Sequence, residues 1–140
     1  MQTDPSKGVP RCRILHIALK VKDLEKPTEF YKKVFGFSEL GTKRSSDHLS
    51  RHMTDGELDL ALMKYDHGTE SAESKASGEG QCIHHFGIEV DDLEKYILEI
   101  KRCGSEIISA PGVLPIKFRT PDGSVAEIAP IGWFGKSAPR

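Results

Sequence analysis

Two histidines and one glutamate occupy matching places in strand-like segments of this sequence. His16 lies in LHIALKV, His85 in HHFGIEV and Glu127 in SVAEIAP, and apolar residues alternate with other types in each segment. A period of two places His16, His85 and Glu127 on the face opposite the apolar residues. Two imidazoles and one carboxylate suit Fe(II), Mn, Zn or Ni and leave positions open for a substrate. The sequence therefore predicts a divalent-metal site built from these three residues.

Each predicted ligand also has an ordinary alternative role. A histidine beside an apolar run is usually a hydrogen-bonded structural residue, and a glutamate in a strand is usually solvated. His84 adjoins His85 and competes with it for the assignment. Strand parity puts His84 on the face of Phe86, toward the expected helices, so His85 is the preferred ligand. The symmetric placement of the three residues favours the metal site over the separate structural roles.

An internal repeat accounts for this symmetry. Residues 16–26 read HIALKVKDLEK and residues 85–95 read HFGIEVDDLEK, with six identities in eleven positions. A glycine and then an Asp-Gly pair follow in the same order in both halves: Gly36 and Asp55-Gly56, then Gly104 and Asp122-Gly123. Self-similarity at a nearly constant spacing indicates a duplicated structural unit.

Each half of the chain has the pattern of the same five elements. An alternating strand leads into a helix, which Asp23 opens in the first half and Asp92 in the second. Short strands joined by Asp-Gly turns follow, and the last of them covers 58–64 or 124–130. The order βαβββ, repeated twice, predicts an α+β fold. The expected divisions are a flexible N-terminal arm, a first unit, a linker rich in Gly, Ser and Glu, a second unit and a C-terminal tail: 1–13, 14–65, 66–81, 82–131 and 132–140.

The composition excludes several classes of protein. Among 140 residues, 20 are Lys or Arg and 21 are Asp or Glu, so no positive excess is present to neutralise nucleic-acid phosphates. No apolar run approaches the roughly 20 residues of a membrane helix, and the first residues lack the apolar stretch of a secretory signal. Three cysteines without a CxxC pair form neither a disulfide framework nor a thiolate zinc site. We therefore expect a cytoplasmic protein that binds neither nucleic acid nor membrane.

The motifs resemble those of the vicinal oxygen chelate superfamily. Each half starts H-x-x-x-x-V-x-D-L-E, and the second half contains P-D-G-x-x-x-E. That superfamily includes glyoxalase I, extradiol dioxygenases, methylmalonyl-CoA epimerase and bleomycin-resistance proteins. The resemblance covers about residues 14–131 and implies a half-open barrel of eight strands, with the metal held at the positions of His16, His85 and Glu127.

The resemblance implies a metal-dependent enzyme. Its substrate is expected to be a small molecule whose vicinal oxygens chelate the divalent ion, with dioxygenase- or lyase-type chemistry. The alternative is a bleomycin-resistance-like protein that binds a small molecule without catalysis, and such proteins generally lack the metal ligands.

One position departs from the glyoxalase I pattern. That enzyme has a fourth ligand, Glu or Gln, on the last strand of the first half, where this chain has Ala61. Asp59 lies one step away on the same face and is a candidate catalytic residue, although a solvated place at the barrel mouth is equally compatible with the pattern. Four polar residues near the turns are candidate substrate-binding groups, although exposed strand residues have the same appearance: Arg51, His52, Lys117 and Arg119.

The predicted architecture also favours a homodimer. A half-open barrel exposes sheet edges, which invite pairing, and one βαβββ unit is too small to bury its own core. We expect a twofold-symmetric dimer with an isologous interface. Exchange of units between chains stays open, because a flexible linker of about 16 residues spans either arrangement.

Overall fold

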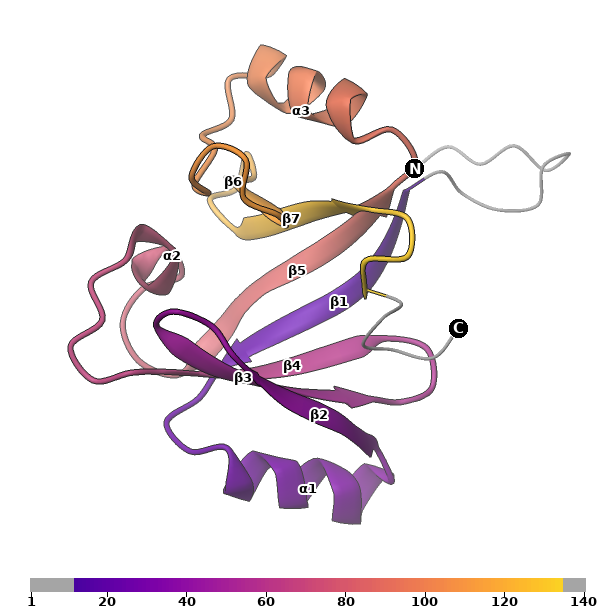
Figure 1. Ribbon diagram of the computed structural model, residues 1–140, viewed down its shortest axis with the longest axis vertical. Coiled ribbons are helices and arrows are strands. Elements are labelled where there is room, and N and C mark those ends of the chain that lie inside the picture. Colours follow the sequence, from indigo (N-terminus) through magenta and orange to yellow (C-terminus); the bar gives the residue numbers. More distant parts are fainter. Residues whose placement is uncertain (1–11, 135–140) are drawn as a thin grey trace, which may run out of the picture.

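The two segments that begin the repeats form the central strands of one curved sheet. They are β1 (Cys12–Lys20) and β5 (Cys82–Val90), which pair in antiparallel orientation. The computed structural model describes residues 12–134, with helices on the outer side of the sheet (Figure 1). Most of the expected N-terminal arm and residues 135–140 of the expected tail lie outside the described residues, whereas Cys12 and Arg13 already belong to β1.

The first half extends the sheet from β1 in one direction. Its elements are α1 (Glu25–Phe35), β2 (Ser38–Arg44), β3 (His48–Thr54) and β4 (Asp59–Tyr65). β4 returns to pair parallel with β1, and β3 and then β2 continue outward in antiparallel pairs. Leu24, Met53 and Leu62 form the buried core of this half, against which Tyr31 of α1 packs.

The second half extends the sheet from β5 in the other direction. Its elements are α3 (Leu93–Arg102), β6 (Ile116–Arg119) and β7 (Val125–Pro130). The helical stripe Leu93, Ile97 and Ile100 packs on Val90 and Ile128, as the apolar spacing predicts. These side chains are partly buried, so each stabilises the fold by less than the about 1.5–3 kcal/mol of a fully buried one. No helix in residues 12–134 is long and apolar enough to cross a membrane.

The sheet contains seven strands in the described part of the chain, in the order β2-β3-β4-β1-β5-β7-β6, and it is not closed. This confirms the α+β, half-open architecture and corrects the expected number of strands. Where a strand matching β2 would lie, only one bridge forms, between Ile107 and Phe118. Pro111 and Pro115 interrupt this segment, and proline has no amide hydrogen to donate to a ladder.

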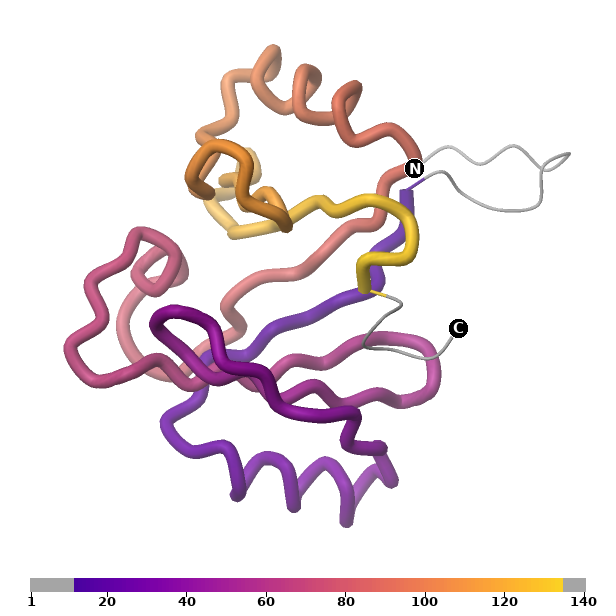
Figure 2. Tube along the Cα trace, viewed as in Figure 1, coloured from indigo at the N-terminus to yellow at the C-terminus, as the bar shows by residue number. Residues whose placement is uncertain are grey.

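The expected linker contains a short helix, α2 (Ala72–Lys75), that the sequence did not predict. The hydroxyl of Ser71 caps it by accepting from the amide of Ser74. Lys20, at the end of β1, donates to the carbonyl of Ser74 at 2.9 Å and to that of Gly78 at 2.6 Å. Figure 2 shows this segment looping past the edge where β1 ends and β5 begins. The segment shows no apolar periodicity because polar contacts, such as those from Lys20 and those of Ser71, hold it in place.

Candidate metal centre

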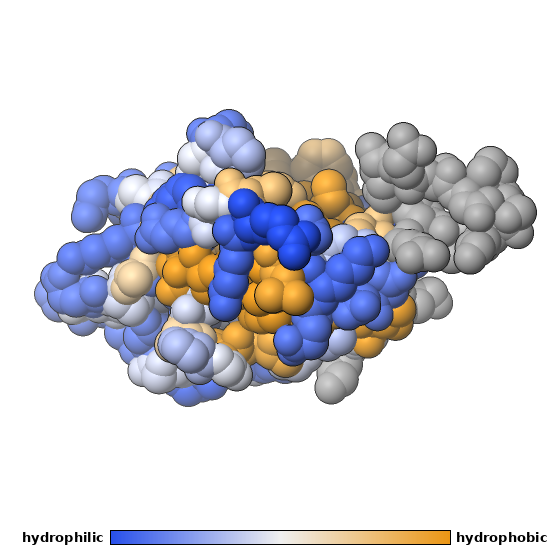
Figure 3. Space-filling view, turned by 90° about the horizontal axis from the view of Figure 1, so that it is seen from above, coloured by the Kyte–Doolittle hydropathy of each residue, from blue (hydrophilic) through white to orange (hydrophobic). Residues whose placement is uncertain are grey.

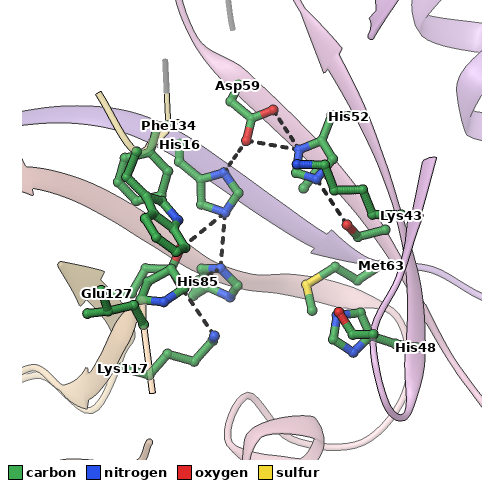
Figure 4. Close-up of a pocket in the computed structure, with 16 residues that line it drawn as sticks. His16, Lys43, His48, His52, Asp59, Met63, His85, Lys117, Glu127 and Phe134 are labelled. Carbon is green, nitrogen blue, oxygen red and sulfur yellow. Dashed lines mark hydrogen bonds and ion pairs between the residues drawn. The ribbon is translucent and has the colours of Figure 1, made fainter. Parts of the chain in front are cut away.

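The three predicted ligands converge inside the curve of the sheet. His16 from β1, His85 from β5 and Glu127 from β7 are all buried (Figure 4). Nε2 of His16 lies 3.1 Å from Nε2 of His85 and 3.4 Å from Oε2 of Glu127. Oε1 of Glu127 lies 3.2 Å from Nε2 of His85. One donor atom from each residue thus lies within 4.8 Å of the others.

Strand register and one glycine make this convergence possible. Gly87 lies opposite His16 in the β1–β5 ladder and opposite Glu127 in the β5–β7 ladder. A Cβ atom at Gly87 would lie 2.9 Å from Cβ of His16 and 2.6 Å from Cζ of Phe134, closer than real Cβ contacts allow. The Phe134 ring stacks on the His16 imidazole, with centroids 5.0 Å apart and planes at 10°. Gly87 therefore leaves the space in which His16 and Phe134 sit.

The hydrogen bond behind His16 determines which nitrogen faces the site. Nδ1 of His16 lies 2.6 Å from Oδ2 of Asp59, which is also hydrogen-bonded to His52. Burial alone would raise the pKa of Asp59, but the bonds from His16 and His52 lower it below its ordinary value. An ionised carboxylate only accepts, so Nδ1 of His16 donates. In the neutral imidazole, Nε2 then presents a lone pair to the site.

A second chain of hydrogen bonds orients His85. Nε2 of His84 lies 2.7 Å from the carbonyl oxygen of Glu73, which only accepts, so this nitrogen donates. Burial and the neighbouring His85 lower the pKa of His84 to about 3, which leaves its Nδ1 as an acceptor. Nδ1 of His85 lies 2.6 Å away and therefore carries the proton. Nε2 of His85, like that of His16, presents a lone pair to the site.

Glu127 completes the set with a carboxylate whose buried Oε1 has no hydrogen-bond partner among the described residues. Burial alone would raise its pKa, but the positive charge of the Lys117 ammonium helps to lower it, so the group is ionised. Oε1 lies 3.1 Å from Nζ of Lys117, yet it is a fully buried atom without a hydrogen bond of acceptable geometry. Lone pairs of His16, His85 and Glu127 thus face one another with no proton assigned between them. This arrangement fits a bound cation, and the donor types suit a divalent metal.

The first half offers no fourth ligand at the symmetric position. In the β5–β7 ladder Glu127 pairs with Gly87, two residues after His85. In the β1–β4 ladder the corresponding partner of Ala18, two residues after His16, is Ala61. Ala61 therefore takes the place that Glu127 has in the second half, and its methyl group cannot coordinate a metal.

Asp59, the candidate catalytic residue, lies behind His16. It is buried and holds His16 and His52 through its two oxygens. The structure thus places Asp59 as a hydrogen-bond partner of a predicted ligand, an arrangement that orients metal-binding histidines in general.

A pocket of about 420 Å³ opens onto the three ligands. It contains two of the four candidate substrate-binding residues, His52 and Lys117. Nζ of Lys117 lies between the carboxylates of Glu127, at 3.1 Å, and Glu73, at 2.9 Å. Burial would lower the pKa of Lys117, but these carboxylates raise it above its ordinary value, so the pocket wall carries a positive charge. The other lining residues are Lys43, Ser45, His48, Ser50, Asp59, Ala61, Met63, Leu114, Pro115, Trp133 and Phe134.

The other two candidate substrate-binding residues, Arg51 and Arg119, do not line this pocket. Arg51 follows Ser50 on β3 and points to the opposite face, where Nη1 lies 3.0 Å from Oε2 of Glu25 in α1. Arg119, at the end of β6, donates to the carbonyls of Ala76 at 2.8 Å and Gly123 at 3.1 Å. Sequence reasoning also missed Ser50 and His48, although both share the parity of His52 on β3.

Comparison with known families identifies the fold. A family model described as the Glyoxalase/Bleomycin resistance protein/Dioxygenase superfamily matches residues 13–128. The chain belongs to this superfamily. Glyoxalase-type members of the superfamily are generally metal-dependent, and in this chain the cluster of His16, His85 and Glu127 is where such an ion fits.

Curated members of the superfamily with related sequences are named as lyases. A lactoylglutathione lyase of Neisseria meningitidis is 29% identical over 116 residues, which cover 77% of each chain. A probable lactoylglutathione lyase of Vibrio cholerae is 29% identical over 132 residues, which cover 83% of this chain and 88% of the relative.

Solved structures of the superfamily share the fold. A hypothetical protein from Bacillus halodurans C-125 matches with a TM-score of 0.71 at 19% identity, covering 86% of this chain and 95% of the other. Methylmalonyl-CoA epimerase from Mycobacterium tuberculosis matches with a TM-score of 0.66 at 17% identity. The match covers 84% of this chain and 86% of the epimerase chain. At such identities these matches establish the fold alone.

Proposed function

We propose that this chain is a divalent-metal-dependent enzyme that performs lyase-type chemistry on a small molecule with two neighbouring oxygens. The observation that carries the proposal is the cluster of lone pairs on His16, His85 and Glu127, in which every proton is directed outward. The names of the curated relatives favour a lyase over a dioxygenase, and lactoylglutathione is the first compound to test.

His16, His85 and Glu127 would hold the ion, which would act as a Lewis acid on the substrate oxygens. Because Ala61 supplies no fourth ligand, more of the coordination sphere is left to the substrate than with four protein ligands. The Lys117 ammonium favours a substrate that carries negative charge beside the chelating oxygens. Met63, Leu114 and Phe134 line the pocket with apolar surface, which strengthens electrostatic interactions by limiting water.

Metal content tests the site directly. The chain is purified without an affinity tag or chelator, supplemented with Mn, Fe, Ni or Zn, and analysed by elemental mass spectrometry. We expect about one metal ion per chain in the parent. His16→Ala, His85→Ala and Glu127→Ala should each reduce this to below about one tenth, with an unchanged circular dichroism spectrum. His67→Ala, a histidine outside the cluster, serves as the matched control and should bind like the parent.

The reaction is tested on the metal-loaded chain with S-lactoylglutathione by measuring the 2-oxoaldehyde that a lyase releases together with glutathione. Formation of this aldehyde should disappear in the ligand variants. Metal binding without turnover of this compound would reject it as the substrate. A parent chain that binds less than about one ion in ten chains under every supplement would reject the enzyme proposal. That result would favour a bleomycin-resistance-like binding protein.

A further inference from the structure

The pocket contains a second chemical group beside the candidate metal centre. Ser50 and His52 lie two residues apart on β3, so both side chains point into the pocket. Oγ of Ser50 lies 3.0 Å from Nε2 of His52, and Nδ1 of His52 lies 2.9 Å from Oδ1 of Asp59. A hydroxyl, an imidazole and a carboxylate are therefore connected in sequence, the order in which serine hydrolases activate a nucleophile.

The hydrogen-bond chain has a defined direction. Nδ1 of His52 lies 2.9 Å and 3.1 Å from the two oxygens of Asp59, which accept, so Nδ1 donates and a lone pair remains on Nε2. The hydroxyl of Ser50 must then donate to Nε2 of His52. This is the tautomer in which the imidazole can take the hydroxyl proton. Asp59 acts here as a positioning residue, whereas Ser50 and His52 would contact the substrate.

Access and charge also fit a reacting group. Ser50 is partly exposed to solvent, and the His52 side chain, at the pocket wall, is 14% exposed. Lys43 is the direct partner of Ser50 in the β2–β3 ladder and lines the same pocket. Directly opposed residues of an antiparallel pair share a face, so Lys43 brings positive charge to the side of the nucleophile. Such charge stabilises an oxyanion that forms there.

We propose that Ser50 and His52, held by Asp59, form a nucleophilic site that hydrolyses small esters or thioesters without a metal. The Oγ of Ser50 bonds to the acyl carbon while its proton passes to Nε2 of His52 and the carbonyl electrons move to oxygen. Collapse restores the carbonyl, breaks the bond to the alcohol or thiol, and returns the proton to that leaving group. Water then attacks the acyl-Ser50 ester by the same steps, releasing a carboxylic acid and regenerating the hydroxyl.

A fluorophosphonate reagent tests this site, because an unactivated serine does not displace its fluoride. The full chain is stripped of metal with a chelator, which is kept present, and is then treated with the reagent. Intact-mass analysis should show one adduct per chain, and peptide mapping should place it on Ser50. Ser50→Ala should abolish the adduct. His52→Ala should slow labelling about 100-fold, within the range of a general base.

Ser124→Ala provides a matched control, because the hydroxyl of Ser124 donates to Asp122 with no imidazole between them. This variant should label like the parent.

Ester hydrolysis provides a second measurement. The metal-stripped parent should release nitrophenol from p-nitrophenyl acetate, and Ser50→Ala should release it no faster than buffer without protein.

Three results would overturn the proposal: a parent chain without an adduct while a reference serine hydrolase labels fully, an adduct on another residue, or equal labelling of His52→Ala and the parent. The chelator separates this test from the metal proposal. Failure of metal binding leaves the labelling result unaffected, and failure of labelling leaves the metal site unaffected.

Discussion

Asp59 is the residue on which both parts of the pocket depend. Its carboxylate accepts from the candidate ligand His16 at 2.6 Å and from His52 at 2.9 Å. A carboxylate behind a metal-binding histidine fixes the ring orientation and makes the other nitrogen a better donor. Two residues later on β4, Ala61 stands at the place of a ligand in the first half but cannot coordinate a metal. The acidic residue of this strand, Asp59, therefore orients the predicted ligand His16 and is not itself a ligand.

Asp59→Asn is expected to weaken metal binding without removing a ligand. An amide oxygen still accepts from Nδ1 of His16, but it carries no charge to raise the basicity of the imidazole. Affinity should fall about 10–100-fold, the usual effect of losing such a supporting group. Titration of the stripped chain with Zn or Ni measures the change. Asp122→Asn, in an exposed turn, controls for the loss of one charge, and equal affinities of Asp59→Asn and the parent would contradict this role.

Gly87→Ala tests the close packing around His16. The new methyl group would press on Cβ of His16 and on the Phe134 ring. We expect a loss of about 1–3 kcal/mol in the free energy of unfolding, as is usual for overpacked cores, together with weaker metal binding. Urea unfolding and metal titration measure both effects. Combination with Phe134→Ala should restore part of the metal affinity, whereas a Gly87→Ala chain indistinguishable from the parent would show that the space is not needed.

At the scale of elements, Asp47 connects the β2–β3 turn to the segment that carries α2. Its carboxylate accepts from the hydroxyl of Ser71 at 2.8 Å and lies 2.7 Å from Nδ1 of His48. Its carbonyl accepts from the amide of Asp66 at 2.9 Å. Burial would raise the pKa of Asp47, but the bonds with His48 and Ser71 lower it overall. The ionised carboxylate therefore stabilises the attachment of this segment to the first half.

The contribution of Asp47 should depend on pH. A carboxyl group with a lowered folded pKa stabilises the protein above its unfolded pKa, near 3.9, and loses this contribution as the pH falls through the folded value. At pH 7, Asp47→Ala should reduce the free energy of unfolding by about 1–2 kcal/mol, for two hydrogen bonds. The difference from the parent should narrow below about pH 4. Urea unfolding of both chains from pH 3 to 7 measures this difference in the free energy of unfolding.

Glu29→Ala is the matched control for Asp47→Ala, because Glu29 is an exposed acid on α1 whose nearest cation, Lys33, lies 3.9 Å away. Its stability should differ little from that of the parent at every pH. A difference between Asp47→Ala and the parent that grows on acidification would contradict the assigned role of the carboxylate.

At the scale of the whole molecule, apolar side chains remain on the surface. Figure 3, a view from the side of α3, shows apolar surface gathered among hydrophilic residues. Large apolar residues that are more than half exposed include Leu98 of α3, Val34 and Phe35 of α1, Ile83 of β5 and Ile131 after β7. Exposed apolar surface of this kind often belongs to an interface between chains.

A homodimer remains our prediction for the molecule in solution. Sedimentation at micromolar concentration should give about twice the 15.5 kDa of one chain, because dimerisation would cover exposed apolar surface and sheet edges. A monomer at this concentration would contradict the predicted dimer.

In this structure His16 and Glu127 reach the site from one chain. Mixing His16→Ala with Glu127→Ala chains should therefore not restore metal binding, and restoration would indicate exchanged units.

Residue patterns along the chain predict the repeat, the central strands and the face on which His16, His85 and Glu127 lie. They do so because the period of a strand is local: parity follows from residue types within a few positions. The same parity placed Ala61, whose side chain has no ligating atom, on the face that the ligands share. These features depend on no distant contact.

Which side chains meet across the strands depends on how the strands pair. Asp59 reaches His52 because the β3–β4 register pairs His52 with Ala61, which puts Asp59 on the diagonal. Shifts of register in the β1–β5 ladder place His16 opposite Gly87. The attachment of the helix α2 depends in the same way on contacts between distant segments, such as the hydrogen bond from Ser71 to Asp47. Register is a property of two strands together, and no single segment encodes it.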